Sequence, residues 1–442
     1  EAALTTKAYL SVTGQTKAKL ELGDDPDRAG IYTLNFNLEN LSEKELSYNV
    51  RAIVMTETTD DGVTIAMRSK ILEGAEIKVY GNGEYKADGI VSAGAYGRTR
   101  IKVVIRLSEE NKQYIDELFP DGMYVDGFIG LESLDEEEND LSIPYLVFYG
   151  DWSSVNVFDK NYYDEEEAQI YKSVPLAVYQ NSHLLPLGEY QYILPSGAEK
   201  PEASYEKIAV SPDGLAGIYT VYMGLLSNAK EVEYIITDDV TGDVVFSLTD
   251  YNVRKAIFST NQGQIIPSYS LINANINDVA YNNRTYTFTV RVTKDYFAAE
   301  AQEWSFPIFF DSTAPVLTDK GAKVDTVDGR TYLTVNVYDN HYLSNVRFYD
   351  IQGTEAGGAL SATPIPVYEF NKGEDNELVY DITDYMDKLS EGKIVVYLED
   401  YAMNYNAYAV SVIDLYKDYD MDGDKIVGYR GEGGDLSVPA VG

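Results

Sequence analysis

Four aspartates near the end of the chain have a spacing that suits a hard metal ion. Asp418, Asp420 and Asp422 alternate with other residues, and Gly423 and Asp424 follow at once. Because a loop with a glycine turn can curl and bring alternate side chains together, these carboxylates could supply several of the roughly six to eight oxygen ligands that Ca²⁺ takes. The sequence therefore predicts a Ca²⁺ site at Asp418, Asp420, Asp422 and Asp424.

The same segment has a second interpretation, because it is not a complete EF-hand. That motif has a bidentate acidic residue at its twelfth position, which counted from Asp418 is Tyr429. Residues 417–442 are therefore either a calcium loop or an acidic linker whose like charges repel one another. Two other acidic runs, at 135–140 and 164–167, lack a glycine turn, and we interpret them as solvated loops.

Catalysis by a serine nucleophile needs a histidine base close to an activated hydroxyl. The chain has two histidines, His183 and His341, and neither is followed by Gly-Thr as in a subtilisin-type base. The Gly-Thr-Ser-Met nucleophile turn is also missing from the sequence. Pairs of carboxylates suited to glycoside hydrolysis are uninformative, since 72 acidic residues guarantee many of them by chance. We predict no catalytic residue in this chain.

The composition excludes several classes of partner and site. The 35 basic and 72 acidic residues give a formal net charge of −37, a field that repels nucleic acid and anionic lipid headgroups. Cysteine is absent, which removes disulfides, thiolate zinc sites and cysteine nucleophiles. No run reaches the ~18 apolar residues of a membrane span. We therefore expect no nucleic-acid binding and no membrane insertion.

Alternation of apolar and polar residues dominates the chain and predicts half-buried strands. In 31–38 the apolar residues fall at every second position, and turn signals such as Asp88-Gly89 and Asp328-Gly329 separate such runs. A helix is expected only in short stretches, the best being 108–118. The predicted fold class is all-β, with three serial β-sandwich modules. The same alternation occurs at 101–107, 286–292, 333–337 and 394–398.

Changes in composition predict where the modules begin and end. Acidic runs flank the apolar stretch 143–152, and proline fixes the hinge in Asp311-Ser312-Thr313-Ala314-Pro315. We therefore predict a first fibronectin type III-like sandwich at 1–153, a second at 154–312, an immunoglobulin-like sandwich at 313–416, and a linker or calcium loop at 417–442.

Several passages together resemble one family. They are LSYNV at 46–50, FPDGMYVDGFIGLES at 119–133, LSIPYLVFYGDW at 141–152, the stretches 210–214 and 225–245, DSTAPVLT at 311–318 and EDYAMNYNAYAV at 399–410. They are similar to the post-catalytic region of cell-envelope subtilisin-like serine proteases of the lactocepin and complement-cleaving peptidase type. Within them, Gly122 and Gly127 are expected to let the backbone turn tightly and approach a neighbouring strand.

The resemblance implies a non-catalytic accessory region of an exported subtilisin-like serine endopeptidase, at the cell wall or cell surface. Its expected partner is the upstream protease domain of the same polypeptide, it would meet protein or peptide substrates only indirectly, and it would be a monomer. A free-standing bacterial surface adhesin or glycan-binding protein built from the same sandwiches remains the alternative, since fold does not determine function.

Overall fold

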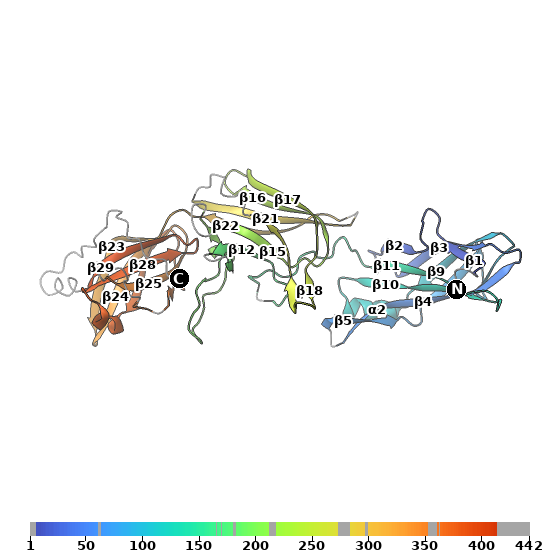
Figure 1. Ribbon diagram of the computed structural model, residues 1–442, viewed down its shortest axis with the longest axis horizontal. Helices are drawn as coiled ribbons and strands as arrows, with labels where there is room; N and C mark the ends of the chain where they lie inside the picture. Colours follow the sequence, from blue (N-terminus) through green and yellow to red (C-terminus); the bar gives the residue numbers. More distant parts are fainter. Residues whose placement is uncertain are drawn as a thin grey trace. The chain divides into compact units, whose positions relative to one another are not determined.

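The computed structural model describes residues 6–60, 63–164, 166–168, 170–179, 183–211, 218–272, 283–296, 299–351, 360–361 and 363–412. The chain forms two compact units, Glu1–Val155 and Asn156–Gly442. Strands make up nearly all the regular structure of both units (Figure 1). The all-β prediction is therefore confirmed. No helix among these residues is both long and apolar enough to span a membrane.

The first unit is a sandwich of two sheets around one core. One sheet has the order β1-β3-β9-β6-β7, and the other has β2-β11-β10-β4-β5 with β8 paired to β4. The elements are β1 (Ala8–Ser11), β2 (Leu20–Asp24), β3 (Ile31–Asn40), β4 (Leu46–Asp60), β5 (Val63–Ile71), β6 (Glu76–Gly81), β7 (Glu84–Tyr85), β8 (Ile90–Ala93), β9 (Arg98–Arg106), α2 (Glu109–Leu118), β10 (Met123–Ser133) and β11 (Leu141–Tyr149).

Alternation places the apolar residues of β3 on the core side of its sheet. Tyr32, Leu34, Phe36 and Leu38 are all buried, and in β9 the alternate residues from Ile101 are buried in the same cluster. The two sheets thus bury their apolar faces against each other, as in other sandwiches.

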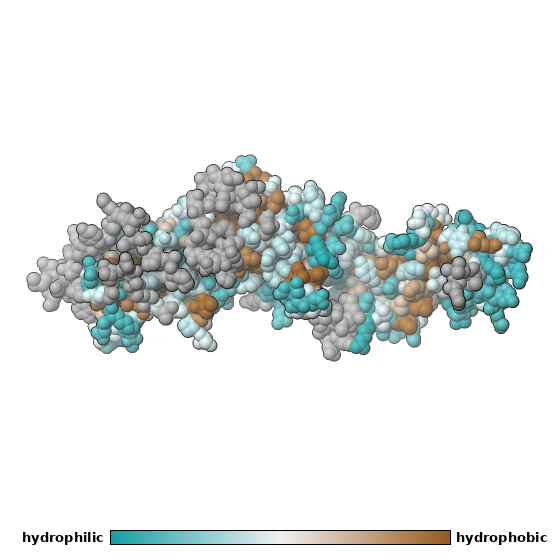
Figure 2. Space-filling view, in the orientation of Figure 1, coloured by the Kyte–Doolittle hydropathy of each residue, from teal (hydrophilic) through white to brown (hydrophobic). Residues whose placement is uncertain are grey.

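The face drawn in Figure 2 shows hydrophobic residues only in small areas among hydrophilic ones.

Local signals in the sequence explain two features of this unit. The predicted helix is present as α2, and the hydroxyl of Ser108 caps it by accepting a hydrogen bond from the amide of Asn111. Gly127 in β10 has φ +152°, and a Cβ atom there would lie 1.9 Å from the carbonyl oxygen of Ile53. The predicted close approach of the backbone at Gly127 is confirmed.

The second unit contains two further pairs of sheets. The first pair has the orders β13-β12-β15-β20 and β14-β22-β21-β16-β17, with a small hairpin β18-β19. Its strands are β12 (Val174–Tyr179), β13 (His183–Pro186), β14 (Ala209–Val210), β15 (Ile218–Met223), β16 (Ala229–Asp238), β17 (Val244–Val253), β18 (Ile257–Ser259), β19 (Gln264–Ile266), β20 (Ser268–Leu271), β21 (Arg284–Lys294) and β22 (Gln302–Phe310), and a 3-10 turn η2 covers Tyr205–Lys207.

The last sandwich pairs the sheet β23-β24-β27 with the sheet β26-β25-β28-β29. Its elements are β23 (Val316–Val327), β24 (Arg330–Tyr338), β25 (Leu343–Asp350), β26 (Ile365–Pro366), β27 (Asp375–Asp381), the 3-10 helix η4 (Thr383–Lys388), β28 (Lys393–Asp400) and β29 (Tyr405–Ser411).

Separate hydrophobic clusters fill the two sandwiches of the second unit. A smaller cluster joins them, formed by Ala209 and Phe309 from one sandwich and Tyr401 and Ala402 from the other, with Tyr342 packed against it. The compact units do not by themselves divide residues 154–312 from residues 313–416, so the proposed module boundaries stay a prediction.

Candidate metal centre

Three aspartates from distant parts of the chain meet where the sandwiches of the second unit join. Asp311 follows β22, Asp339 follows β24, and Asp400 is the last residue of β28. One carboxylate oxygen of each lies within 4.8 Å of one from each of the others. Strand ends from both sandwiches therefore place three acidic side chains at one point.

The three aspartates are almost completely buried. The exposed fraction is 0% for Asp311 and 1% for Asp339 and Asp400. Buried carboxylates are normally paired with a cation, because removing a charge from water is costly. In the described ranges, the ion pairs of Lys and Arg involve other acids and none of these three.

Asp311 and Asp339 each use one oxygen to order a neighbouring loop. Asp311 Oδ1 accepts hydrogen bonds from the amide of Thr313 at 2.9 Å and from Asn340 Nδ2 at 3.1 Å. Asp339 Oδ1 accepts one from the amide of His341 at 2.8 Å. The Oδ2 atoms of Asp311 and Asp339 are buried and have no hydrogen-bond partner, and neither has Asn340 Oδ1.

The carboxylate of Asp400 accepts two hydrogen bonds from Asn404. The backbone amide of Asn404 donates to Asp400 Oδ1 at 2.8 Å, and its side-chain Nδ2 donates to Oδ2 at 2.9 Å. The same Nδ2 also donates to the carbonyl oxygen of Asp311 at 3.0 Å. Asn404 thus connects the loop after β28 to the end of β22 in the neighbouring sandwich.

The pKa values of the three aspartates are raised because the carboxyl groups are buried. Burial, with a smaller contribution from the Asp311 charge, raises the pKa of Asp339 to about 7. Burial and then the charges of Asp339 and Asp311 raise the pKa of Asp400 well above its usual range. Burial also raises the pKa of Asp311. The protein alone therefore disfavours the fully ionised cluster, and a bound cation would reverse this preference.

The spacing of the three carboxylates suits a single hard cation. Oxygens on one Ca²⁺ lie at about 2.3–2.6 Å from the ion, so two of them are separated by at most about 5 Å. The separations within 4.8 Å fall inside that limit. Carboxylate and amide oxygens are also the donor type that Ca²⁺ and Mg²⁺ select.

The metal site that the sequence predicts lies elsewhere. Asp418, Asp420, Asp422 and Asp424 fall outside the described residues, so that site stays a prediction.

The sequence analysis missed the buried cluster, although its parts carry a signal. Asp311, Asp339 and Asp400 each stand at the end of an alternating strand, and each carboxylate accepts a hydrogen bond from a backbone amide two to four residues later. Such turns recur in the chain, for example at Asp238. Local spacing alone therefore could not select these three.

The side chain of His341 lies among aromatic rings in the described structure. The ring of His341 is buried and stacks on Phe309 with centroids 4.3 Å apart. Burial lowers the pKa of His341 to about 3, and neither ring nitrogen has a hydrogen-bond partner. No hydroxyl nucleophile is therefore hydrogen-bonded to it. His183 is the first residue of β13.

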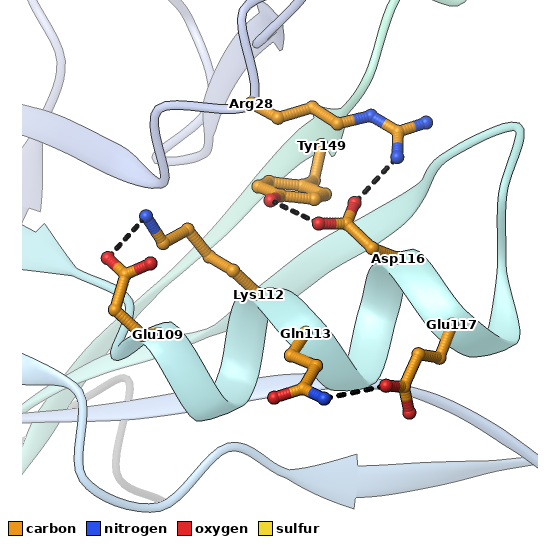
Figure 3. A pocket seen from close by; sticks show the side chains of 7 residues that line it. All are labelled: Arg28, Glu109, Lys112, Gln113, Asp116, Glu117 and Tyr149. Atoms are coloured by element: carbon orange, nitrogen blue, oxygen red, sulfur yellow. Dashed lines mark hydrogen bonds and ion pairs between the residues drawn. The ribbon is translucent and has the colours of Figure 1, made fainter.

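A recess beside α2 in the first unit offers a contrast (Figure 3). Its two basic side chains each pair with an acid: Arg28 Nη1 lies 2.6 Å from Asp116 Oδ1, and Lys112 Nζ lies 2.6 Å from Glu109 Oε1. The third acid, Glu117, accepts a hydrogen bond from Gln113 Nε2 at 2.6 Å. The residues that line it are Arg28, Glu109, Lys112, Gln113, Asp116, Glu117 and Tyr149.

Comparison with known proteins identifies a distant relationship. No family model matches the chain. The C5a peptidase of Streptococcus pyogenes is 23% identical over 163 residues, which are 37% of this chain and 13% of that protein. The C5a peptidase of S. pyogenes serotype M18 (strain MGAS8232) matches with the same identity and coverage. The chain thus matches only a small part of the length of these relatives.

The comparison with solved structures gives alignments with low scores. The FN1–FN3 domains of chicken CNTN1 align over 86% of this chain and 97% of theirs, with 9% identity and a TM-score of 0.25. A tetra-tandem repeat from the extending region of a large adhesion protein aligns over 91% of this chain and 72% of its own, with 13% identity and a TM-score of 0.20. At these scores the alignments carry no argument about function.

Proposed function

We propose that this chain is the non-catalytic accessory region of an exported subtilisin-like serine endopeptidase. It supports the protease domain, spaces it from the cell wall, and shapes the access of protein substrates. The observation that carries this proposal is the similarity of 163 residues to the C5a peptidases of S. pyogenes. The location at the cell surface and the upstream protease domain as partner in the same polypeptide belong to the same proposal.

Contacts between the sandwiches of the second unit support a mechanical role. Besides the apolar cluster around Phe309, the hydroxyl of Tyr192 donates to Glu399 Oε1 at 2.6 Å, and that of Tyr190 donates to the carbonyl oxygen of Pro364 at 3.0 Å. The hydroxyl of Tyr342 donates to Glu206 Oε2 at 2.9 Å. Specific contacts of this kind fix the orientation of neighbouring domains better than a linker alone.

The chemistry of the described residues agrees with a supporting role. The amide of His341 donates to Asp339, and the buried His341 ring contacts the aromatic rings of Phe309 and Tyr342. Catalysis by a serine nucleophile would require a histidine base placed against it, and neither ring nitrogen of His341 has a hydrogen-bond partner in the described structure. In this proposal the catalytic machinery belongs to the upstream protease domain.

The test uses the intact polypeptide that contains this chain. Its coding sequence is expected to include a subtilisin-type Asp, His and Ser triad before residue 1. Removing residues 1–412 from the intact enzyme should then lower kcat/KM for a folded protein substrate more than for a short peptide. An intact polypeptide without a protease domain would contradict the proposal and favour a surface adhesin or glycan-binding protein.

A further inference from the structure

The junction of the second unit contains more buried negative charge than the described protein groups compensate. Among the described residues, Asp311, Asp339 and Asp400 have no basic partner, and their carboxylates converge within 4.8 Å. Two other buried acids of this unit do have a basic partner: Asp238 pairs with Arg284 and Glu399 with Arg347. The cluster differs from these two in gathering three buried carboxylates at one point without a basic partner among the described residues.

A second observation points to a ligand rather than to loop structure alone. The carboxylate oxygens Asp311 Oδ2 and Asp339 Oδ2 are buried without a hydrogen-bond donor. The amide oxygen of Asn340 is likewise unpartnered, and its amide group adjoins the cluster because Asn340 Nδ2 donates to Asp311 Oδ1. Leaving such acceptors unsatisfied is costly, and a cation would satisfy all three.

We propose that Asp311, Asp339 and Asp400 bind one Ca²⁺ ion, with the side-chain oxygen of Asn340 as a further ligand. All of these donors are hard oxygens, which disfavours zinc or copper. His341 is the nearby residue that could favour a softer metal, but its ring stacks on Phe309 and is not part of the cluster. Ca²⁺ suits the site better than Mg²⁺, which dehydrates reluctantly and demands a near-ideal octahedron.

The ion would act as a clamp between two sandwiches. Asp311 follows β22 of one sandwich, whereas Asp339 follows β24 and Asp400 ends β28 of the other. An ion that binds all three joins the sandwiches directly, and Asn404 supports the same joint by contacting both Asp400 and the backbone of Asp311. Because the ligands come together only in the folded junction, metal binding stabilises that junction by mass action.

The test is thermal unfolding of the full chain after treatment with EDTA and again with CaCl₂ at ~100 times the dissociation constant. The proposal predicts that Ca²⁺ raises the Tm of the transition of the second unit by about 5 °C or more. Magnesium chloride at the same ionic strength should raise it less. Equal shifts with the two salts would indicate general screening and overturn the proposal.

Three variants separate this site from the predicted loop near the end of the chain. Asp339→Asn preserves the side-chain shape and removes one charge, so it should fold in EDTA and lose the Ca²⁺-dependent shift in Tm. The double variant Asp420→Asn/Asp422→Asn should keep the shift.

Asp325→Asn is the matched control, because Asp325 lies in the last sandwich away from the cluster and pairs with Lys323; it should also keep the shift. The proposed Ca²⁺ site is contradicted if Asp339→Asn retains the full Ca²⁺-dependent shift in Tm, or if the double variant loses it. Calorimetric titration should give one binding event fewer for Asp339→Asn than for the unmodified chain.

Discussion

Glu399 and Asp400 are consecutive residues of β28, yet the protein treats their charges in opposite ways. Glu399 faces a cation and several donors: Arg347 Nη2 at 3.1 Å, the hydroxyl of Tyr192 at 2.6 Å and that of Tyr397 at 3.1 Å. Asp400 lies instead beside Asp311 and Asp339, and among the described residues its carboxylate accepts hydrogen bonds from Asn404 alone. Side chains alternate across a strand, so adjacent residues can meet different surroundings.

This difference shows which of the two buried charges the chain can stabilise alone. Arg347 is itself held in place, because its guanidinium lies 4.3 Å from the ring centroid of Tyr192 and 5.0 Å from that of Tyr397. The charge of Glu399 is therefore balanced by protein groups alone, and we call these residues the Glu399 cluster. The Asp400 cluster has the opposite composition, acids and amides without a cation, and its stability should depend on the solution.

The largest effect is expected from removing the protein's own cation. Arg347→Met leaves Glu399 buried without a countercharge, and we expect the free energy of unfolding of the second unit to fall by about 3–5 kcal/mol. Urea unfolding monitored by circular dichroism measures the change. The loss should be the same in EDTA and in Ca²⁺, because the Glu399 cluster does not include the proposed ion.

Arg330→Met is the control for that experiment. Arg330 pairs with Asp381 on an exposed face of the same sandwich, so its removal should cost less than about 1 kcal/mol. A comparable loss for the two arginine variants would mean that burial does not distinguish the two ion pairs.

A steric change in the first unit gives a reference variant, because Ca²⁺ should not restore the stability that it loses. Gly127→Ala places a Cβ atom 1.9 Å from the carbonyl oxygen of Ile53, and we expect the first unit to lose about 3 kcal/mol or more in free energy of unfolding. Gly130→Ala on the same strand is the control, since its Cβ would lie 4.0 Å from the nearest atom, Arg51 O. Rescue of Gly127→Ala by Ca²⁺ would contradict this account.

Neutralising Asp400 should change the free energy of unfolding differently in EDTA and in Ca²⁺. In EDTA, Asp400→Asn removes an uncompensated buried charge, so the free energy of unfolding should stay the same or rise by about 1 kcal/mol. At a Ca²⁺ concentration ~100 times the dissociation constant, the variant should be less stable than the unmodified chain by about 2–3 kcal/mol. Urea unfolding in both buffers measures this crossover, and a variant that is destabilised equally in both would contradict it.

Removing one hydrogen bond to Glu399 should have a smaller effect on stability. Tyr192→Phe removes the donor to Glu399 and should lower the free energy of unfolding of the second unit by about 1.5 kcal/mol. Tyr368→Phe is the control, because its hydroxyl donates to the carbonyl oxygen of Glu199 at an exposed position and should cost less than about 0.5 kcal/mol. Equal losses would show that the charge of Glu399 adds nothing to this hydrogen bond.

The fold was largely predictable from the sequence because strand alternation is a local property. Tyr32, Leu34 and Phe36 are buried as their spacing indicates, and Ser108 begins the helix where its hydroxyl can cap it. Gly127 was also recognisable, since a glycine inside an alternating strand indicates close approach of another backbone.

The buried cluster was not predictable, because its residues are far apart in the sequence. Asp311, Asp339 and Asp400 meet only after three strands have paired and two sandwiches have packed together. A search by spacing selects acids within one loop, as at Asp418 and Asp420, and cannot find acids at the ends of separate strands. Nothing in the local sequence shows that Glu399 receives a cation and that Asp400 does not.

A crystal structure of the full chain grown with Ca²⁺ tests the central claim most directly. An anomalous difference map should show a peak at about 2.3–2.6 Å from one oxygen each of Asp311, Asp339 and Asp400. The claim is contradicted if these carboxyl groups instead form hydrogen bonds to one another, with no peak between them, in crystals that contain Ca²⁺.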